Sequence, residues 1–363
     1  MVEKAQEKAL KELDEFGNQL LEKLNKKEAP SFQIPSRTRS NVEFDEKKEI
    51  IDITGKKSTR SFINASHVRK FMQTLLVARA AEEYIKNNRT VSKRELYYNL
   101  KHKLPGTNKN TWDDDNESSA VIDDLEATLG IVRQQMNVSA KSRGSIYGDI
   151  TLKQAGDEFS CKRLGKGGWA IPGNVEDVEI VDYNAELILF IETEAMHSRL
   201  IEEGSYDDLD ALLVTGQGMP PRGVKRFLKR LQDETDLPLI AFTDGDPFGF
   251  YIYSVLKHGS MQLAHVNNYY ALPNSKFIGM TMDDIDKYEL QNVTENLDEQ
   301  ARKKIEHNLN YEWFKYHPEW IKEMKKMRKK GVRIEQQALA NKSLDFVAKT
   351  YLPEKIENEE FLP

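Results

Sequence analysis

The 363-residue sequence contains one cysteine, Cys161, and this scarcity excludes several classes of protein. A single thiol cannot form an internal disulfide or build a zinc site of the cysteine type. No uninterrupted apolar stretch is long enough to span a bilayer, and charged residues begin at the third position. We therefore expect a cytoplasmic protein.

A phosphate-binding loop of the Walker type is also missing. Residues 165–168 read Gly-Lys-Gly-Gly, without the spacing or the Lys-Ser/Thr ending that such a loop needs. If the activity of this protein depends on ATP, we expect the nucleotide to bind to a different chain.

Positive charge is scarce overall, because the formal net charge is -6, but it is concentrated in one window. Residues 56–103 contain twelve Lys or Arg against three acidic residues. A window of this kind can bind a phosphate backbone, and it can equally be a solvated basic face. Charge alone does not decide between the two.

The chain is long enough for two domains preceded by an extension. In the extension, residues 1–65, apolar residues at helical spacing predict an amphipathic helix over 3–27. A Pro- and Ser-containing stretch ends it, and residues 42–54 are expected to form short extended segments. The helix needs a surface to cover.

Residues 66–153 predict a domain of three helices followed by a β-hairpin. The first helix starts at Ser66, and Ser92 with Glu95 forms a capping box that opens the second. Gly130 ends the third helix, and residues 131–153 have the composition of a hairpin. This order is typical of a CAP-like winged-helix domain that binds DNA.

Residues 154–363 predict an α/β domain with a parallel sheet. Apolar runs at 187–191, 212–214 and 239–242 alternate with helices, which is typical of strands buried on both faces. Helices are expected at 320–330 and 335–351. The fold class is therefore an α/β multidomain protein with a winged-helix domain first.

Acidic residues follow two of these buried runs: Glu192 comes after the first, and Asp244 and Asp246 come after the third. Ligands of open parallel sheets bind at this edge. Clustered carboxylates repel one another, so Mg2+ is the natural occupant. Asp246 alone could be a helix cap before Pro247, but two acidic strand ends are hard to explain as caps.

Tyr97 and Tyr98 are candidates for a nucleophile in the second helix. Tyr97 shares the spacing of the buried stripe, whereas Tyr98 lies on the face of Arg94, whose guanidinium could bind a phosphate. A tyrosine here is more often core packing or a phosphate contact. Tyr98 is the better nucleophile, and its general base stays unassigned, because His67 or His102 would be a guess.

These motifs resemble those of the DNA-cleaving chain of the archaeal type IIB topoisomerases, a family related to the protein that initiates meiotic double-strand breaks in eukaryotes. The resemblance covers nearly the whole chain. Residues 92–98, Ser-Lys-Arg-Glu-Leu-Tyr-Tyr, match the family's tyrosine motif. Residues 213–220, 335–340 and 345–347 are similar to further stretches of this family.

The resemblance implies a Toprim metal-binding domain with Glu192, Asp244 and Asp246 as ligands of Mg2+, and Tyr98 as the nucleophile. Family members usually have Lys where Thr193 and Gln217 stand here. Both differences remove a positive charge near the metal site.

The resemblance also implies an assembly. Two copies of the chain form a homodimer that cuts double-stranded DNA, and each Tyr98 joins a 5′ phosphate. A partner B subunit with a GHKL-type ATPase binds ATP and completes an A2B2 heterotetramer that relaxes and decatenates DNA in the nucleoid.

Three other interpretations stay open. A Toprim nuclease would hydrolyse DNA without a covalent intermediate, and a non-enzymatic winged-helix regulator would need no metal. A meiotic-type enzyme would cut DNA without strand passage.

Overall fold

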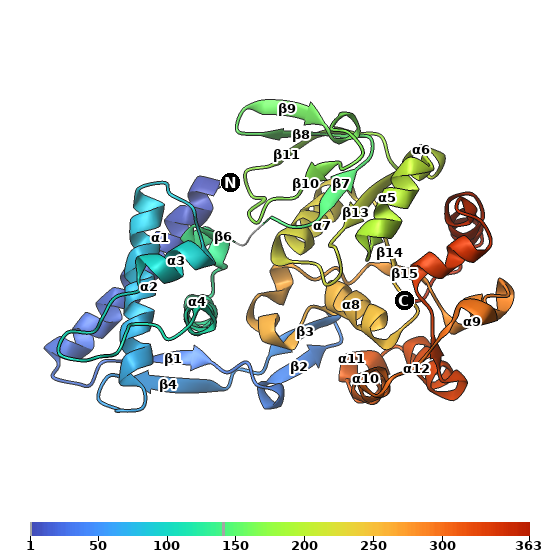
Figure 1. Ribbon diagram of the computed structural model, residues 1–363. Helices are drawn as coiled ribbons and strands as arrows, with labels where there is room; N and C mark the ends of the chain where they lie inside the picture. Colours follow the sequence, from blue (N-terminus) through green and yellow to red (C-terminus); the bar gives the residue numbers. More distant parts are fainter. Residues whose placement is uncertain (1, 140–141) are drawn as a thin grey trace. The chain divides into compact units, whose positions relative to one another are not determined.

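The chain folds into two compact units (Figure 1). The computed structural model describes residues 2–139 and 142–363. Unit 1 comprises the described residues of Met1–Val42, Asp52–Lys141 and Met261–Val266. Unit 2 comprises Glu43–Ile51, Ser142–Ser260 and Asn267–Pro363. Each unit thus contains residues of both predicted ranges 1–65 and 66–153, and the domain boundary after residue 153 stays a prediction.

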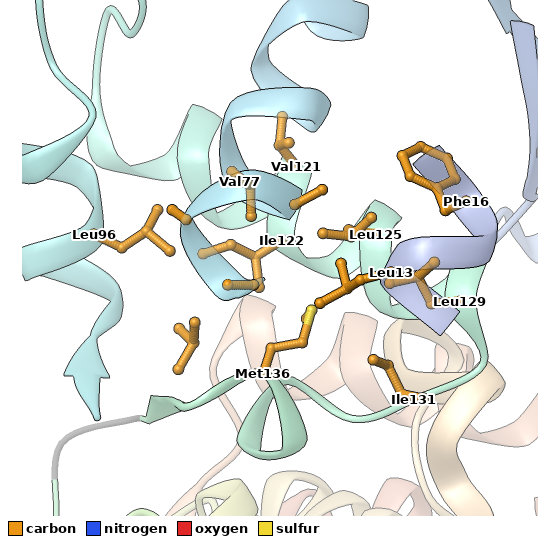
Figure 2. Packing of buried hydrophobic residues seen from close by; sticks show 14 of the residues in the cluster. Leu13, Phe16, Val77, Leu96, Val121, Ile122, Leu125, Leu129, Ile131 and Met136 are labelled. Atoms are coloured by element: carbon orange, nitrogen blue, oxygen red, sulfur yellow. The ribbon is translucent and has the colours of Figure 1, made fainter. Parts of the chain in front are cut away.

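Unit 1 is built mainly from helices. Within its described residues these are α1 (Val2–Asn25), α2 (Val68–Lys86), α3 (Lys93–Asn99) and α4 (Asp115–Leu129). Figure 2 shows their shared core, in which Leu13, Val77, Leu96 and Leu125 come from the four helices in turn. All four side chains are at most 6% exposed. The predicted amphipathic helix is confirmed as α1, which buries its apolar face in this cluster.

Local signals set the ends of these helices. The Ser92 side chain accepts from the Glu95 backbone N–H at 3.1 Å, and the Ser92 N–H donates to the Glu95 carboxylate at 2.6 Å. The capping box is therefore confirmed. Gly130 ends α4 with a φ of 65°, a conformation that costs glycine little.

The hairpin expected over residues 131–153 is wrong. Its described residues join three different structures: β6 (Val138–Ser139) pairs in parallel with β5 (Val91–Ser92). Further on, β7 (Ser145–Tyr147) enters the large sheet of unit 2, and β8 (Ile150–Gln154) pairs with β9 (Asp157–Ser160). Short strands carry too little local pattern to identify their partners.

Two pairs of strands precede α2, and the second pair confirms the extended segments expected over residues 42–54. Antiparallel pairing joins β1 (Ser31–Pro35) to β4 (Lys57–Ser61). A second two-stranded sheet joins β2 (Val42–Asp45) to β3 (Ile50–Ile53).

A six-stranded sheet forms the centre of unit 2. Its order is β10 (Trp169–Ala170), β7, β13 (Ala211–Thr215), β12 (Leu187–Ile191), β14 (Leu239–Phe242) and β15 (Lys276–Gly279). Strands β13, β12, β14 and β15 run parallel, and β7 is antiparallel to β13. Every residue of β12, β13 and β14 is buried, which confirms the predicted parallel core.

Two further small sheets lie in the described part of unit 2. One has the order β11 (Glu179–Tyr183), β8 and β9, and it was not predicted. The other pairs β16 (Glu295–Asn296) with β17 (Val332–Arg333).

The helices of unit 2 fall into two groups. Those that follow strands of the sheet are α5 (Glu194–Glu202), α6 (Ser205–Asp208), α7 (Arg222–Thr235), α8 (Pro247–His258) and α9 (Met282–Lys287). The C-terminal group is α10 (Glu299–Leu309), α11 (Glu312–Lys315), α12 (Pro318–Lys330) and α13 (Leu352–Glu357). Among the described residues, no helix combines the length and apolar character needed to cross a membrane.

The C-terminal predictions are confirmed in part. The helix expected at 320–330 lies within α12. The continuous helix expected over 335–351 is wrong, because a 3-10 helix at Gln336–Asn341 and a π-helical turn at Val347–Tyr351 stand there instead.

Candidate functional site

The acidic residues that follow β12 and β14 share one edge of the sheet. The two strands are parallel neighbours, and Ile191 is paired with Phe242 in their register. The next backbone N–H, that of Glu192, donates to the Phe242 carbonyl at 3.0 Å. The register therefore places Glu192 and Asp244 side by side where the strands end.

Each of the three carboxylates accepts backbone N–H groups. Glu192 accepts from the N–H of Asp244 at 3.0 Å, and Asp244 accepts from the N–H of Gln336 at 2.9 Å. Asp246 caps α8, because its Oδ1 accepts from Phe248 at 2.9 Å and Gly249 at 2.6 Å. The cap anticipated for Asp246 is thus real, and it uses only one of the two oxygens. Within the described residues, the other oxygen of this carboxylate is left for another ligand.

Burial makes these carboxylates reluctant to ionise. It raises the pKa of Glu192 to about 8, helped by repulsion from Asp244. Burial likewise raises the pKa of Asp244 to about 6, although the Gln336 N–H opposes the shift. The pKa of Asp246 is raised for the same reason, against the two N–H groups of the cap. A cation at this edge would relieve the cost of ionising all three.

Mg2+ fits this donor set chemically, because it prefers hard oxygen ligands and is usually held by one or two carboxylates with retained waters. In the described residues, the oxygens of Glu192, Asp244 and Asp246 do not form a set of three within 4.8 Å of one another. Two carboxylates at neighbouring strand ends suffice for an ion that keeps part of its hydration shell.

The segment that follows β17 completes the site, and sequence reasoning missed it. Gly245 donates its N–H to the Ile334 carbonyl at 2.8 Å, which brings residues 333–336 against the acidic edge. There Glu335 raises the pKa of Asp244 and Arg333 lowers it. The one signal in the sequence was the resemblance of residues 335–340 to the family's tail.

Thr193 and Gln217 are uncharged side chains that form hydrogen bonds near the acidic edge. Thr193 caps α5, and its hydroxyl lies 3.1 Å from the side-chain oxygen of Gln336. The Gln217 amide donates to Glu194 at 3.1 Å. Neither side chain therefore adds a positive charge to this edge of the sheet.

Tyr98 lies on α3 in unit 1 and is 59% exposed, whereas its neighbour Tyr97 is 7% exposed. The Arg94 guanidinium carbon lies 5.9 Å from the centre of the Tyr98 ring. Tyr97 packs edge-on against Tyr98 and accepts a hydrogen bond from Lys101 at 2.6 Å. The facing expected from the sequence is confirmed: Tyr98 and Arg94 are together and accessible, and Tyr97 is held in the core.

Part of the positive charge in residues 56–103 is neutralised inside unit 1. Arg60 pairs with Asp124 at 2.7 Å, and Arg69 pairs with Asp113 at 2.7 Å. Arg94 has no carboxylate partner in the described residues. Fewer positive charges can therefore bind a phosphate than the twelve Lys and Arg counted in the sequence. The Arg94 guanidinium beside Tyr98 is one of those that can.

Three family models match successive parts of the chain. Residues 69–138 match a model described as Type IIB DNA topoisomerase. Residues 143–184 match the all-beta domain of the DNA topoisomerase VI alpha chain, and residues 187–356 match the Toprim domain of topoisomerase 6 and Spo11. The second range contains the three-stranded sheet together with β7 and β10, and the third contains Glu192, Asp244 and Asp246.

Relatives named as the A chain of type 2 DNA topoisomerase 6 match along almost the full length. The protein from Pyrococcus horikoshii is 46% identical, over 98% of this chain and 96% of its own. The protein from Hyperthermus butylicus is 36% identical over 99% and 97%, and that from Methanocaldococcus jannaschii is 36% identical over 98% and 96%. The chain belongs to the family of DNA-cleaving A chains of topoisomerase 6.

Proposed function

We propose that this chain is the DNA-cleaving catalytic subunit of a type IIB topoisomerase, an ATP-dependent enzyme that passes one duplex through a transient break in another. The observation that carries the proposal is the presence in one chain of two complementary parts. An exposed tyrosine stands beside an arginine on a capped helix, and buried carboxylates stand at the edge of a Toprim sheet.

In the cleavage step, the Tyr98 oxygen attacks a backbone phosphorus and the 3′ oxygen leaves. The Tyr98 hydroxyl loses its proton as a 5′-phosphotyrosyl bond replaces the bond from phosphorus to the 3′ oxygen, and the departing 3′ oxygen takes up a proton in its place. The reverse reaction reseals the strand. Arg94 would bind the non-bridging oxygens of the phosphate and stabilise their charge.

Glu192, Asp244 and Asp246 would hold Mg2+, which supplies positive charge and orients the phosphate when bound. Asp246 is fixed by the N-terminus of α8, and Glu192 by the backbone N–H of Asp244. These two carboxylates are therefore held by backbone N–H groups before the substrate arrives, which lowers the cost of reorganisation during the reaction.

We extend the proposal to the domains. Residues 1–65 would be an extension, the helical part of 66–153 a winged-helix domain that presents Tyr98, and 154–363 the metal-binding part with its C-terminal helices. The order of α2, α3 and α4 supports a helix-turn-helix arrangement, in which α3 would approach the duplex.

The assembly is also part of the proposal. Two copies of the chain would cut the two strands, with Tyr98 of one copy working with the carboxylates of the other. A B subunit would bind ATP and complete an A2B2 tetramer on the nucleoid. Leu21 and Leu24 of α1 are 57% and 54% exposed, and they offer an apolar contact for that partner.

Covalent trapping tests the proposal. The chain is incubated with its B subunit, supercoiled DNA, Mg2+ and ATP, then denatured and digested with protease. We expect peptide on the 5′ ends of the cut DNA with the wild type and none with Tyr98→Phe. DNA that is cut without attached peptide would show instead that the chain is a hydrolytic Toprim nuclease. Tyr97→Phe serves as the matched control and should still trap DNA.

A further inference from the structure

A cluster of two histidines and a glutamate lies in unit 2 and takes no part in the proposed cleavage. It consists of Glu49 in the turn between β2 and β3, His258 at the end of α8, and His317 just before α12. One ligand atom of each residue lies within 4.8 Å of the other two. In the described residues, no other group of three His, Cys, Asp or Glu side chains meets this condition.

The hydrogen bonds of His258 fix its tautomer. Its Nδ1 lies 2.6 Å from the backbone carbonyl of Glu49, and a carbonyl can only accept, so Nδ1 carries the hydrogen. The Nε2 atom of the neutral ring then carries no hydrogen, and its lone pair can accept a hydrogen bond or bind a metal ion. An imidazole that donates from one nitrogen to a backbone carbonyl and offers the other is the usual state of a histidine that binds a metal.

The second imidazole is aimed at the same point. His317 Nε2 lies 3.0 Å from His258 Nε2, and the two residues are 5% and 0% exposed. Without an ion, a proton on His317 Nε2 makes this contact a hydrogen bond. Two nitrogens bound to one tetrahedral zinc ion are ~3.4 Å apart, so opening the pair by ~0.4 Å would admit the ion.

Aromatic side chains hold both rings in place. Phe44 stands edge-on to His258 with the ring centres 5.0 Å apart, and Trp320 stacks on His317 at 4.5 Å. Because the rings are held by packing, the ligands are pre-organised and little side-chain freedom would be lost on binding.

Glu49 supplies the negatively charged ligand, and a metal ion could reach the site from solvent on the side of this residue. Its side chain is 32% exposed, and its carboxylate lies 3.9 Å from the ammonium group of Lys257. Lys257 is also held by the carbonyls of Pro273 and Ser275, so it can release Glu49 without losing all its partners. Two imidazoles and one carboxylate favour Zn2+ or Co2+ over Mg2+, and leave a fourth position for water.

We propose that Glu49, His258 and His317 form a second metal site, which binds one divalent transition-metal ion such as Zn2+. The ion would tie the turn between β2 and β3 to α8 and α12. The segment Glu43–Ile51 belongs to unit 2, while the chain on both sides of it belongs to unit 1. The bound ion would therefore hold residues 43–51 in place, where the chain passes from unit 1 into unit 2 and back.

Metal titration of the full-length, untagged chain tests this site. Co2+ is added in the presence of excess Mg2+, which occupies the acidic edge, and absorption in the visible range reports ligation by nitrogen. Competition with a chelator then gives the affinity for Zn2+. We expect one ion per chain, and binding weakened at least ~10-fold in Glu49→Gln and in His317→Gln. His307→Gln, an exposed histidine of α10, is the matched control and should bind like the wild type.

Circular dichroism checks that each variant is folded. If His317→Gln fails to fold, Glu49→Gln decides, because Glu49 is partly exposed and lies in a turn. A wild-type chain that binds no Co2+ under these conditions would overturn the proposal. Binding by Glu49→Gln with unchanged affinity would overturn it as well.

Discussion

The two parts of the proposed cleavage site differ most in their exposure to water. Tyr98 is 59% exposed and Glu192 is 8% exposed. A nucleophile must reach a phosphate on the surface of a duplex, so it has to project from its domain. Carboxylates that hold a cation act more strongly in a site of low dielectric constant, so they benefit from burial. The structure separates these requirements between unit 1 and unit 2.

The two parts also depend on different ranges of sequence. Tyr98 is positioned by a capping box within a few residues of it, whereas the acidic edge assembles residues 192, 244 and 336. Substitutions should therefore affect the two parts differently, and the expected effects below run from the largest to the smallest.

Neutralising the buried carboxylates should have the largest effect. Glu192→Gln and Asp244→Asn remove ligands of Mg2+, and the rate of cleavage should fall ~10²–10³-fold, the size expected for losing one electrostatic contact to a transition state. Gel-based cleavage at saturating Mg2+ measures this rate. Glu194→Gln, an exposed neighbour that binds Gln217, is the control and should cleave normally. Undiminished cleavage by Asp244→Asn would remove the acidic edge from the reaction.

Substituting Arg94 should have a smaller effect. Arg94→Ala loses a charge that would contact the phosphate, and cleavage should fall ~10–10²-fold. Arg94→Lys keeps the charge but not the bidentate geometry and should lie in between. Arg89→Ala, another exposed arginine of the basic window, should change cleavage little. Equal losses in Arg89→Ala and Arg94→Ala would point to general DNA binding.

Removing the N-cap of α3, the helix that carries Tyr98, should reduce local stability and cleavage only modestly. Ser92→Ala loses the hydrogen bond to the Glu95 N–H and should cost about 1 kcal/mol of local stability in α3. Hydrogen exchange should then be faster in α3, and cleavage should fall a few-fold. Glu95→Gln retains a capping box and should keep most of the protection. Exchange in α3 that does not change in Ser92→Ala would show that packing of Leu96 alone fixes the helix.

The smallest effect is a pH dependence of the melting temperature to which the acidic edge contributes. The pKa values of Glu192 and Asp244 are raised from 4.5 to about 8 and from 3.8 to about 6. A carboxyl with a raised folded pKa stabilises the fold at low pH, and this stabilisation is lost as pH rises through the folded value. Burial lowers the pKa values of His258 and His317 to about 3 and about 4, so these two groups oppose the fall below about pH 6.5. The melting temperature of the metal-free chain should therefore fall by a few degrees between about pH 6.5 and pH 8, where Glu192 still ionises.

Calorimetry with and without Mg2+ checks this prediction. Mg2+ should reverse the fall, because it binds the ionised carboxylates. Glu192→Gln should flatten the curve, since it removes the group with the larger shift. A melting temperature that rises steadily from pH 6.5 to pH 8 in the metal-free chain would contradict the raised pKa of Glu192.

The same contrast explains what could be predicted from the sequence. The cap at Ser92, the facing of Tyr98 and the stop at Gly130 follow from neighbouring residues. The strand ends at Glu192 and Asp244 were predictable because whole strands are apolar and buried. Each of these features could be predicted because the residues that determine it lie within one short segment of the sequence.

The remaining features depend on partners that are distant in the sequence. Strand β7 pairs with β13, more than sixty residues further along, so residues 131–153 do not form a hairpin. The helix expected over 335–351 breaks near Ser343 and Asp345, whose side chains bond to each other, as polar residues of this kind often compete with helix formation. Glu49, His258 and His317 share no motif, and only the fold brings them together.

Mixing two inactive chains tests most directly whether Tyr98 and the acidic edge act as one site across a dimer. Tyr98→Phe and Asp244→Asn are combined, supplied with the B subunit, DNA, Mg2+ and ATP, and assayed for covalent cleavage. If Tyr98 of one copy works with the carboxylates of the other, the mixed dimer keeps one complete site. Nicks in a single strand with protein on the 5′ end are then expected. A mixture as inactive as each parent, with mixed dimers shown to form, would contradict the account.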